Sequence, residues 1–455
     1  MEIREYLENN FRELKSDLAR LIAVPSVSGE KEGKYPFGRE CGNALEEFMK
    51  IAEEKGFSAK NYDYYAGSAD MFPEGEPELG ILAHLDVVPV SERDWTLPPF
   101  KLTEKDGRLY GRGSIDDKGP LLAALYAMKA VKECGYKLRG NVRLIAGCSE
   151  ETGSEIDIEE YMKRAKMPSM VFTPDAEFPI ITTEKGMLRF TFGGEVKTDL
   201  ILSIKGGTVV NAVPAEVTMV LKGRVRLPQI QQNEFICVGY EDANTVITCK
   251  GVSAHASTPE AGKNAFTRLF HCLMSSEALA ESDRKLIGGL LKLFPKNQWN
   301  AEALGLAAED KSGATTCVFS IIDFKDGRLM AKADMRFPVS LTKAKCTEKI
   351  KEAVEKAGFV LIEVTGSEPH CTDNDSPFVK SLLKAYTDVT GKEGFCKAIG
   401  GGTYVHGIEG GVAFGMEVEG ENNHMHGDDE WVGEKTLLTA AEIYAKAILE
   451  VMEEK

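Results

Sequence analysis

The chain reads Gly111-Arg112-Gly113-Ser114-Ile115-Asp116-Asp117-Lys118-Gly119-Pro120 where a predicted strand gives way to an apolar helix. Gly111 and Gly113 permit backbone angles that other residues resist, and the Lys-Gly-Pro end is typical of a first helical turn. The stretch therefore predicts a strand-to-helix corner that carries two adjacent aspartates. These acids can be an ordinary helix N-cap or part of a metal site, and the other acids and histidines of the chain decide between the two.

The segments around this corner alternate between strand and helix patterns. In chain order they predict helices at 3–22 and 40–56, a strand at 79–84, a hairpin turn at 106–107, the helix after Asp116, a strand at 142–147, a helix at 156–165 and a strand at 170–173. Strand-helix-strand order of this kind implies a largely parallel sheet that is covered by helices on both faces. We therefore expect an α/β catalytic domain with a mixed, largely parallel sheet.

The pattern changes after about Lys185. Strand-like segments at 188–192, 200–204 and 215–221 follow one another without long helices, and helices are predicted only at 264–273 and 341–357. These segments indicate an inserted α+β lid domain, and two blocks of strands followed by a helix are compatible with two similar halves. The earlier style returns with helices at 378–387 and 434–452. We expect a catalytic domain of residues 1–185 and 378–455 and a lid of residues 186–377.

Composition narrows the class of protein. The chain has 455 residues, more than one hydrophobic core usually supports, which predicts two or more domains. Its hydrophobic content of 43% is normal for a folded globular protein. The charged N-terminus and the lack of a long apolar run predict a cytoplasmic protein without a membrane partner. Ten cysteines without a C-x-x-C pair indicate reduced thiols rather than a disulfide framework or a thiolate zinc site. The net charge of -16 argues against nucleic acid as a partner.

Polar residues follow several predicted strands. His84 and Asp86 close the strand at 79–84 and point to the same side, since Leu85 lies between them. A lone histidine here would usually be structural, but an aspartate two residues on favours a metal-bound imidazole whose other nitrogen is oriented by Asp86. Glu150 and Glu151 follow the strand at 142–147, where the alternative is a solvated acidic loop.

Asp175 ends a third strand, and His426 supplies a late imidazole. Histidine and carboxylate ligands without thiolate suit zinc or a similar divalent ion. Five such ligands with one shared acid suit two ions about 3.5–4 Å apart. Such a site also needs a base for the proton of the attacking water, and one of the glutamates can be that base.

These residues belong to motifs that resemble a zinc peptidase family, the family of carboxypeptidase G and aminoacylase, across essentially the whole chain. The motifs are His84-x-Asp86-x-Val88-Pro89, the Gly111 to Gly119 corner, Glu150-Glu151, Asp175, and His426 followed by Glu430. The PepV-type dipeptidase branch is the most similar, because residues 36–45, Asp94-Trp95-Thr96-x-Pro98-Pro99-Phe100 and Gly400-Gly401-Gly402-Thr403-Tyr404 also resemble it.

The resemblance implies a role for each residue of the site. Asp116 would bridge two Zn²⁺ ions, for which Co²⁺ or Mn²⁺ can substitute, and the peptide bond between Asp116 and Asp117 would be cis. His84 and Asp175 would complete one ion, and Glu151 and His426 the other. Glu150 would be the general base and Asp86 the residue that orients His84.

The predicted lid carries further candidates. His255, in Gly251-Val252-Ser253-Ala254-His255-Ala256-Ser257, is similar to the lid histidine that stabilises the tetrahedral oxyanion in this family, although it can instead be a structural residue near a helix. Asn211 and Arg336 match lid positions that hold substrate in the dipeptidase branch. Arg336 can clamp a terminal carboxylate with two hydrogen bonds. Its alternative is a surface ion pair at a strand end.

The glycine-rich loop supplies the last candidates. The absence of a following Gly-Lys-Ser/Thr disfavours a nucleotide-binding loop, and Gly401, Gly402 and Thr403 can instead receive a substrate carboxylate. The chain departs from the PepV-type pattern in two places. His406 stands where an arginine is expected, and His424 competes with His426 as a ligand, although the downstream Glu430 favours His426.

The sequence therefore predicts an enzyme that hydrolyses small peptides, most of all dipeptides with a free N-terminus. One alternative is a deacylase or desuccinylase that acts on N-acylated amino acids. Another is a metal-binding sensor or scaffold without catalysis, which the presence of Glu150 beside the ligands disfavours. Dimeric relatives use a short lid and borrow a histidine from the partner subunit, whereas this insert is long enough to replace the partner. A monomer is expected.

Overall fold

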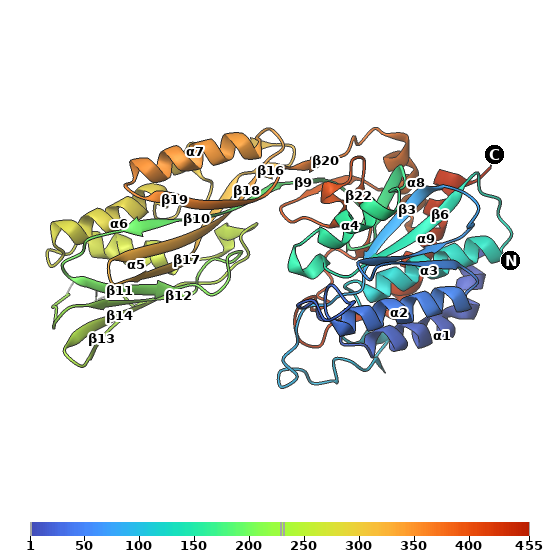
Figure 1. Cartoon of the computed structure of the whole chain (residues 1–455), viewed down its shortest axis with the longest axis horizontal. Coiled ribbons are helices and arrows are strands. Elements are labelled where there is room, and N and C mark those ends of the chain that lie inside the picture. Colours follow the sequence, from blue (N-terminus) through green and yellow to red (C-terminus); the bar gives the residue numbers. More distant parts are fainter. Residues whose placement is uncertain (1, 228–229, 231–232, 455) are drawn as a thin grey trace. The chain divides into compact units, whose positions relative to one another are not determined.

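The computed structural model describes residues 2–227, 230 and 233–454. The chain forms two compact units (Figure 1). The first unit contains Met1–Thr183, Cys371–Lys397 and Gly402–Lys455, and the second contains Glu184–His370 and Ala398–Gly401. The second unit thus interrupts the first in the sequence. The roles of residues 1–185 and 378–455 as a catalytic domain and of residues 186–377 as a lid stay predictions.

A mixed sheet forms the centre of the first unit. Its strands are β1 (Ser58–Tyr62), β2 (Ala66–Asp70), β3 (Pro77–His84), β6 (Asn141–Gly147), β7 (Met170–Thr173), β9 (Ile180–Glu184), β20 (His370–Cys371), β21 (Cys396–Ile399) and β22 (Val412–Ala413). They lie in the order β1-β2-β6-β3-β7-β22-β9-β20, with β21 beside β9. Parallel pairs join β6, β3, β7 and β22, and antiparallel pairs extend the sheet on both sides. This confirms the predicted mixed α/β fold.

Helices cover this sheet because their apolar stripes need a partner surface. They are α1 (Ile3–Ile22), α2 (Arg39–Glu54), α3 (Lys118–Glu133), α4 (Ile156–Arg164), α8 (Pro377–Thr390) and α9 (Glu434–Met452). The chain crosses through α3 from β3 to β6 and then through α4 in the opposite direction along the sheet, from β6 to β7. Right-handed crossovers therefore place α3 and α4 on opposite faces. Short ladders join β4 (Thr103–Lys105), β5 (Arg108–Tyr110) and β24 (Trp431–Gly433), and β8 (Ala176–Glu177) and β23 (Met416–Glu417).

The corner at residues 111–120 forms as predicted. Helix α3 begins at Lys118, and the peptide bond between Asp116 and Asp117 is cis, which confirms the bond that the resemblance implied. Lys118 is fully buried and donates hydrogen bonds to the backbone carbonyls of Leu21, at 3.0 Å, and Val24, at 2.8 Å. The start of α3 is therefore tied to the end of α1 and to the segment that follows it.

The second unit contains one continuous antiparallel sheet. Its strands are β10 (Gly186–Glu195), β11 (Ile201–Gly206), β12 (Glu216–Leu221), β13 (Ile236–Glu241), β14 (Asn244–Lys250), β17 (Thr316–Lys325), β18 (Arg328–Phe337) and β19 (Val360–Ser367), in the order β13-β14-β12-β11-β17-β18-β10-β19. A two-stranded ladder joins β15 (Glu309–Asp310) and β16 (Gly313–Ala314). The two predicted blocks of strands therefore share a single sheet.

Helices α5 (Ala265–Met274) and α7 (Lys343–Lys356) pack on strands of this sheet, and α6 (Glu281–Leu293) packs on α5. Short 3-10 turns lie at Pro259–Ala261 and Glu302–Leu304. Alternate residues of β10, such as Leu188, Phe190 and Phe192, are buried, as expected for a sheet with one covered face. The sequence did not predict α6.

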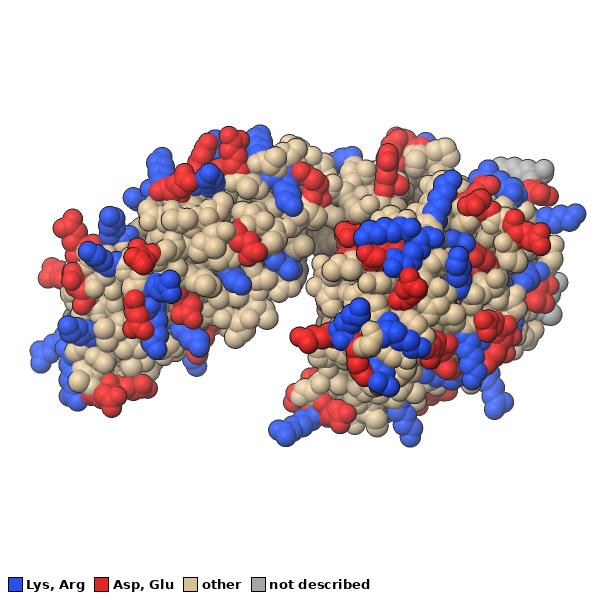
Figure 2. All heavy atoms as spheres, viewed as in Figure 1, with Lys and Arg blue, Asp and Glu red and all other residues tan. Residues whose placement is uncertain are grey.

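The surface of each unit mixes charges of both signs. On the face drawn in Figure 2, Lys and Arg side chains alternate with Asp and Glu over both units. None of the helices in the described ranges combines the length and the apolar character needed to cross a bilayer.

Candidate metal centre

His84 lies at the end of β3 with a fully buried side chain. Its Nδ1 lies 2.9 Å from the backbone carbonyl oxygen of Asp86 and 3.5 Å from the carboxylate Oδ1 of the same residue. On the other side of the ring, Nε2 lies 2.9 Å from Oδ1 of Asp116 and 3.5 Å from Oδ2 of Asp175. Asp86 therefore holds the imidazole mainly through its backbone, with Nε2 directed at two carboxylates.

Asp116 lies between two clusters of side chains. One of its oxygens faces His84, and the other, Oδ2, lies 2.8 Å from Nε2 of His426. The same His426 nitrogen lies 3.1 Å from Oε2 of Glu151. A carboxylate that presents one oxygen to each of two imidazoles has the geometry of a bridging ligand.

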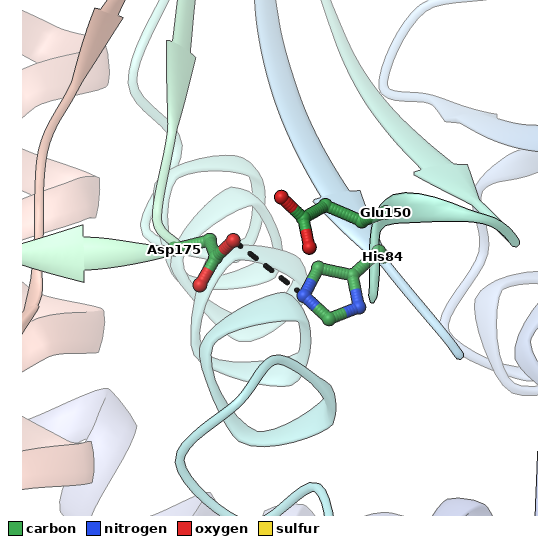
Figure 3. Close-up of side chains that lie close together, drawn as sticks. All are labelled: His84, Glu150 and Asp175. Carbon is green, nitrogen blue, oxygen red and sulfur yellow. Dashed lines mark ion pairs between the residues drawn. The ribbon is translucent and has the colours of Figure 1, made fainter. Parts of the chain in front are cut away.

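This region contains two sets of potential ligand atoms, and within each set the atoms all lie within 4.8 Å of one another. The first contains His84, Glu150 and Asp175, and the second contains Asp116, Glu151 and His426. Figure 3 shows the first set, in which the Glu150 carboxylate and Asp175 approach His84 from different strand ends. The carboxyl ends of β3, β6 and β7 meet at one sheet edge because these strands are parallel, which brings the residues together.

The donor set fits a pair of divalent cations. Among the described residues, Nε2 of His84 is buried without a hydrogen-bond partner of acceptable geometry, although two carboxylates lie beside it. A buried imidazole nitrogen without such a partner is costly unless it ligates a metal. Imidazole and carboxylate ligands without thiolate suit zinc and similar ions.

The close carboxylates and imidazoles shift one another's pKa values. Burial and the neighbouring Asp175 raise the pKa of Glu150 well above its usual value. Burial and Asp116 raise the pKa of Glu151 to about 7. Hydrogen bonds to Asp116 and Glu151 raise the pKa of His426 to about 11. Like charges at this spacing oppose ionisation, so that bound cations would relieve a repulsion that the fold maintains.

These shifts predict that zinc uptake releases protons. At pH 7 His426 carries a proton, because its pKa is about 11, and Glu151 is protonated in about half of the molecules, because its pKa is about 7. These protons must leave before the two residues can bind a metal. We expect calorimetric titrations at pH 7 in buffers of different ionisation enthalpy to show release of about one proton or more. His424→Ala should leave this number unchanged. Binding heats that are independent of the buffer would contradict the prediction.

A buried ion pair holds the corner to the loop of His426. Arg112 donates from Nη1 to Glu430, at 2.5 Å, and from Nη2 to the carbonyl of Gly427, at 3.0 Å. Oε1 of Glu430 accepts the backbone N–H groups of Gly113 and Ile115, both at 3.0 Å. Glu430 is fully buried, and its many partners explain why a charge is tolerated there. From the sequence, Glu430 served only to favour His426 over His424 as a metal ligand, and its buried contacts with the corner were not predicted.

The Asp94 to Phe100 motif contacts the same loop. Oδ1 of Asp429 accepts the backbone N–H of Thr96, at 2.8 Å, and Oδ2 accepts its hydroxyl, at 2.7 Å. The guanidinium of Arg112 lies 5.2 Å from the ring centroid of Trp95, within range of a cation–π contact. The motif therefore contacts both the loop that carries His426 and the corner that carries Asp116.

His406 and His424, the two departures from the PepV-type pattern, belong to neither set of potential metal ligands. Nδ1 of His424 lies 2.8 Å from the carbonyl oxygen of Asp428, so the structure brings His426 and not His424 beside Asp116. His406 belongs to the short 3-10 turn η4 (Tyr404–Gly407), after Gly402 and Thr403. Those two residues belong to the first unit, whereas Gly401 belongs to the second.

The remaining predicted residues belong to the second unit. The segments of Asn211 and His255 pair through an isolated bridge between Ala212 and His255, and Nδ1 of His255 lies 2.7 Å from the hydroxyl of Ser257. The structure therefore brings Asn211 and His255 onto adjacent segments. Their roles toward substrate stay predictions.

Arg336, in the same unit, is buried and forms an ion pair with Asp334 through Nε, at 2.7 Å, and Nη2, at 3.2 Å. Its Nη1 donates to the carbonyl of Gly400, at 2.9 Å. The pair is buried rather than on the surface. Since a guanidinium carries five N–H groups and three are used here, each terminal nitrogen keeps one for a carboxylate.

Comparisons of the sequence and of the fold with known proteins identify the family. Residues 80–450 match Peptidase family M20/M25/M40. A protein of Lactobacillus delbrueckii subsp. lactis named Beta-Ala-Xaa dipeptidase is 32% identical over 99% of this chain and 100% of its own length. The structure of human carnosine dipeptidase 1 has a TM-score of 0.61 at 17% identity, with 98% of each chain covered. The dipeptidase Dug1p of Saccharomyces cerevisiae also gives 0.61, at 13% identity, with 98% of this chain and 97% of that chain covered. The chain therefore belongs to peptidase family M20/M25/M40 and is a metallopeptidase.

Proposed function

We propose that this enzyme is a two-zinc dipeptidase that cleaves dipeptides with a free N-terminus and uses Glu150 as its general base. The observation that carries the proposal is the position of Asp116, whose two oxygens face His84 and His426, with Glu150 beside the first cluster. The similarity to a Beta-Ala-Xaa dipeptidase over the full length supports the dipeptide substrate class.

In this proposal the ligands divide between the two ions. His84 and Asp175 would hold one, Glu151 and His426 the other, and Asp116 would contact both. Two bound zinc ions would polarise the scissile carbonyl and lower the pKa of the attacking water. Co²⁺ or Mn²⁺ would fill the same oxygen and nitrogen donor set.

Glu150 would take a proton from the attacking water and deliver it to the nitrogen of the leaving amino acid. Its carboxylate lies near His84 and Asp175 but leaves the bridging position to Asp116. Burial and Asp175 raise its pKa well above the usual value, which makes the carboxylate a stronger proton acceptor. The backbone of Glu150 is fixed by Asp86, whose Oδ1 accepts its N–H at 3.2 Å.

A substrate panel tests this proposal. We expect the zinc-loaded enzyme to cleave a free dipeptide, including a β-alanyl dipeptide, much faster than the N-acetylated form of the same dipeptide. A chelator should abolish the activity, and zinc, cobalt or manganese should restore it to different extents. Preference for the blocked substrate would instead support the deacylase alternative. Metal uptake without hydrolysis of either substrate would support a non-catalytic metal-binding protein.

A further inference from the structure

The loop after β6 has an unusual backbone arrangement. The consecutive N–H groups of residues 148–151 all point at buried carboxylates. Oδ2 of Asp157 accepts the N–H of Cys148, at 2.7 Å, and of Ser149, at 2.9 Å. Oδ1 and Oδ2 of Asp86 accept the N–H of Glu150, at 3.2 Å, and of Glu151, at 3.0 Å. The path of the loop before the turn η1 (Glu150–Thr152) is therefore set by two aspartates.

Tyr404 completes one half of this support. Its hydroxyl donates to the same Oδ2 of Asp157 that receives Cys148 and Ser149, and its oxygen lies 3.4 Å from the Ser149 nitrogen. The Tyr404 side chain is buried, and its ring meets the His84 ring edge-on, with centroids 6.1 Å apart. Tyr404 thus contacts both His84, a proposed metal ligand, and the loop that leads to Glu150 and Glu151.

The space for this hydroxyl depends on Gly147. A Cβ atom at position 147 would lie 2.3 Å from the Tyr404 hydroxyl and 2.6 Å from Oδ2 of Asp157. Both atoms belong to buried, hydrogen-bonded groups, so neither can move aside cheaply. The last residue of β6 is therefore small where the tyrosine and the aspartate reach the loop backbone.

We propose that Tyr404 and Asp157 are positioning residues that set the placement of Glu150 and Glu151, an inference that rests on the function proposed above. Asp157 and Tyr404 contact neither cluster of ligand atoms except through the edge of the His84 ring. They act on the loop backbone, which carries the proposed base and one proposed ligand in adjacent positions. Because a displacement of the order of 1 Å can cost about 100-fold in rate, loosening this loop should lower turnover rather than binding.

The same contact links two loops that are far apart in the sequence. Tyr404 directly follows Thr403, the last residue of the glycine-rich stretch that we expect to receive a substrate carboxylate. Asp157 is the second residue of α4, and its Oδ1 accepts the N–H of Ile158 at 2.8 Å. Through its hydroxyl, Tyr404 therefore connects the start of η4 to the first turn of α4 and to the loop at residues 148–151, which carries the proposed general base.

Tyr404→Phe tests the proposal, because it removes the hydroxyl and keeps the ring. We expect kcat for a dipeptide to fall by about 10- to 100-fold, with KM little changed and two zinc ions retained. In the zinc-loaded protein, hydrogen exchange of the peptide that covers residues 148–152 should be faster than in the wild type. Asp157→Asn, which keeps an acceptor oxygen, should retain more activity than Asp157→Ala.

Tyr126→Phe is the matched control. Its hydroxyl donates to Oδ2 of Asp17 at 2.7 Å in another buried tyrosine–aspartate pair, between α3 and α1. We expect this variant to lose stability without a change in kcat or in exchange at 148–152. Wild-type exchange in Tyr404→Phe and in Asp157→Ala would overturn the proposal, as would slow turnover with unchanged exchange. Failure of the wild type to cleave dipeptides would refute the proposed function, while the exchange measurement would still decide whether the hydroxyl holds the loop.

Discussion

Glu150→Gln should lower kcat for a dipeptide by about 10²- to 10⁴-fold, the range that a positioned general base contributes. The amide keeps the size of the side chain and cannot accept the proton of the attacking water. Since Glu150 is proposed as the base and not as a ligand, both zinc ions should remain bound. Steady-state kinetics and metal analysis of the purified variant measure the two effects separately.

Glu159→Gln is the control for this change. Glu159 is exposed on α4 in the same segment of the chain, and its substitution should leave both turnover and metal content unchanged. Loss of one zinc ion in Glu150→Gln would reassign Glu150 as a ligand, which its position beside His84 and Asp175 allows. Unchanged hydrolysis with full metal content would remove the proposed mechanism.

Asp116→Ala should cost the enzyme both metal ions and therefore all measurable activity. Each oxygen of Asp116 faces a different imidazole, at 2.9 Å for His84 and 2.8 Å for His426, so one substitution removes a ligand from both proposed sites. His84→Ala should spare one ion, because the second cluster of Asp116, Glu151 and His426 remains complete. Metal analysis of the two variants, after equal exposure to zinc, compares these outcomes directly.

Thermal unfolding gives an independent measure. A ligand that binds only the folded state raises the unfolding temperature, by an amount that grows with the logarithm of its concentration divided by its dissociation constant. We therefore expect zinc to raise the unfolding temperature of the wild type most, that of His84→Ala less, and that of Asp116→Ala least. His424→Ala should respond like the wild type, since that side chain contacts the Asp428 carbonyl. Equal loss of metal in His84→Ala and Asp116→Ala would contradict a bridging role.

Much of the first unit was predictable from the sequence because periodicity and local chemistry agree there. The predicted helix at 3–22 matches α1, and the strand at 170–173 matches β7. The helix α6 was missed, since Gly288 and Gly289 weaken a helical pattern that packing on α5 then stabilises. Local propensity gave little sign of that tertiary contact.

The proposed ligands were recognisable because each lies at the end of a predicted strand or in a motif of the family. Their supports were not recognisable, because they depend on contacts between distant segments. Asp157 accepts hydrogen bonds from the backbone of Ser149, eight residues before it, and from the hydroxyl of Tyr404, 247 residues after it. No spacing in the sequence indicates such bonds. Likewise, the sequence predicted that Asp86 orients His84, but not that the Asp86 carboxylate accepts the N–H groups of Glu150 and Glu151.

The place of β22 in the central sheet has a consequence for protein synthesis. This strand, Val412–Ala413, lies between β7 and β9, and α9 packs on α3 and on α1. A nascent chain that has only emerged through the second unit therefore lacks a middle strand, a core helix and His426. The second unit can collapse around its own core while the first still awaits its last segment. The proposed two-ion site can therefore form only after His426 has left the ribosome, and a product that ends before β22 would lack both this residue and a middle strand of the sheet.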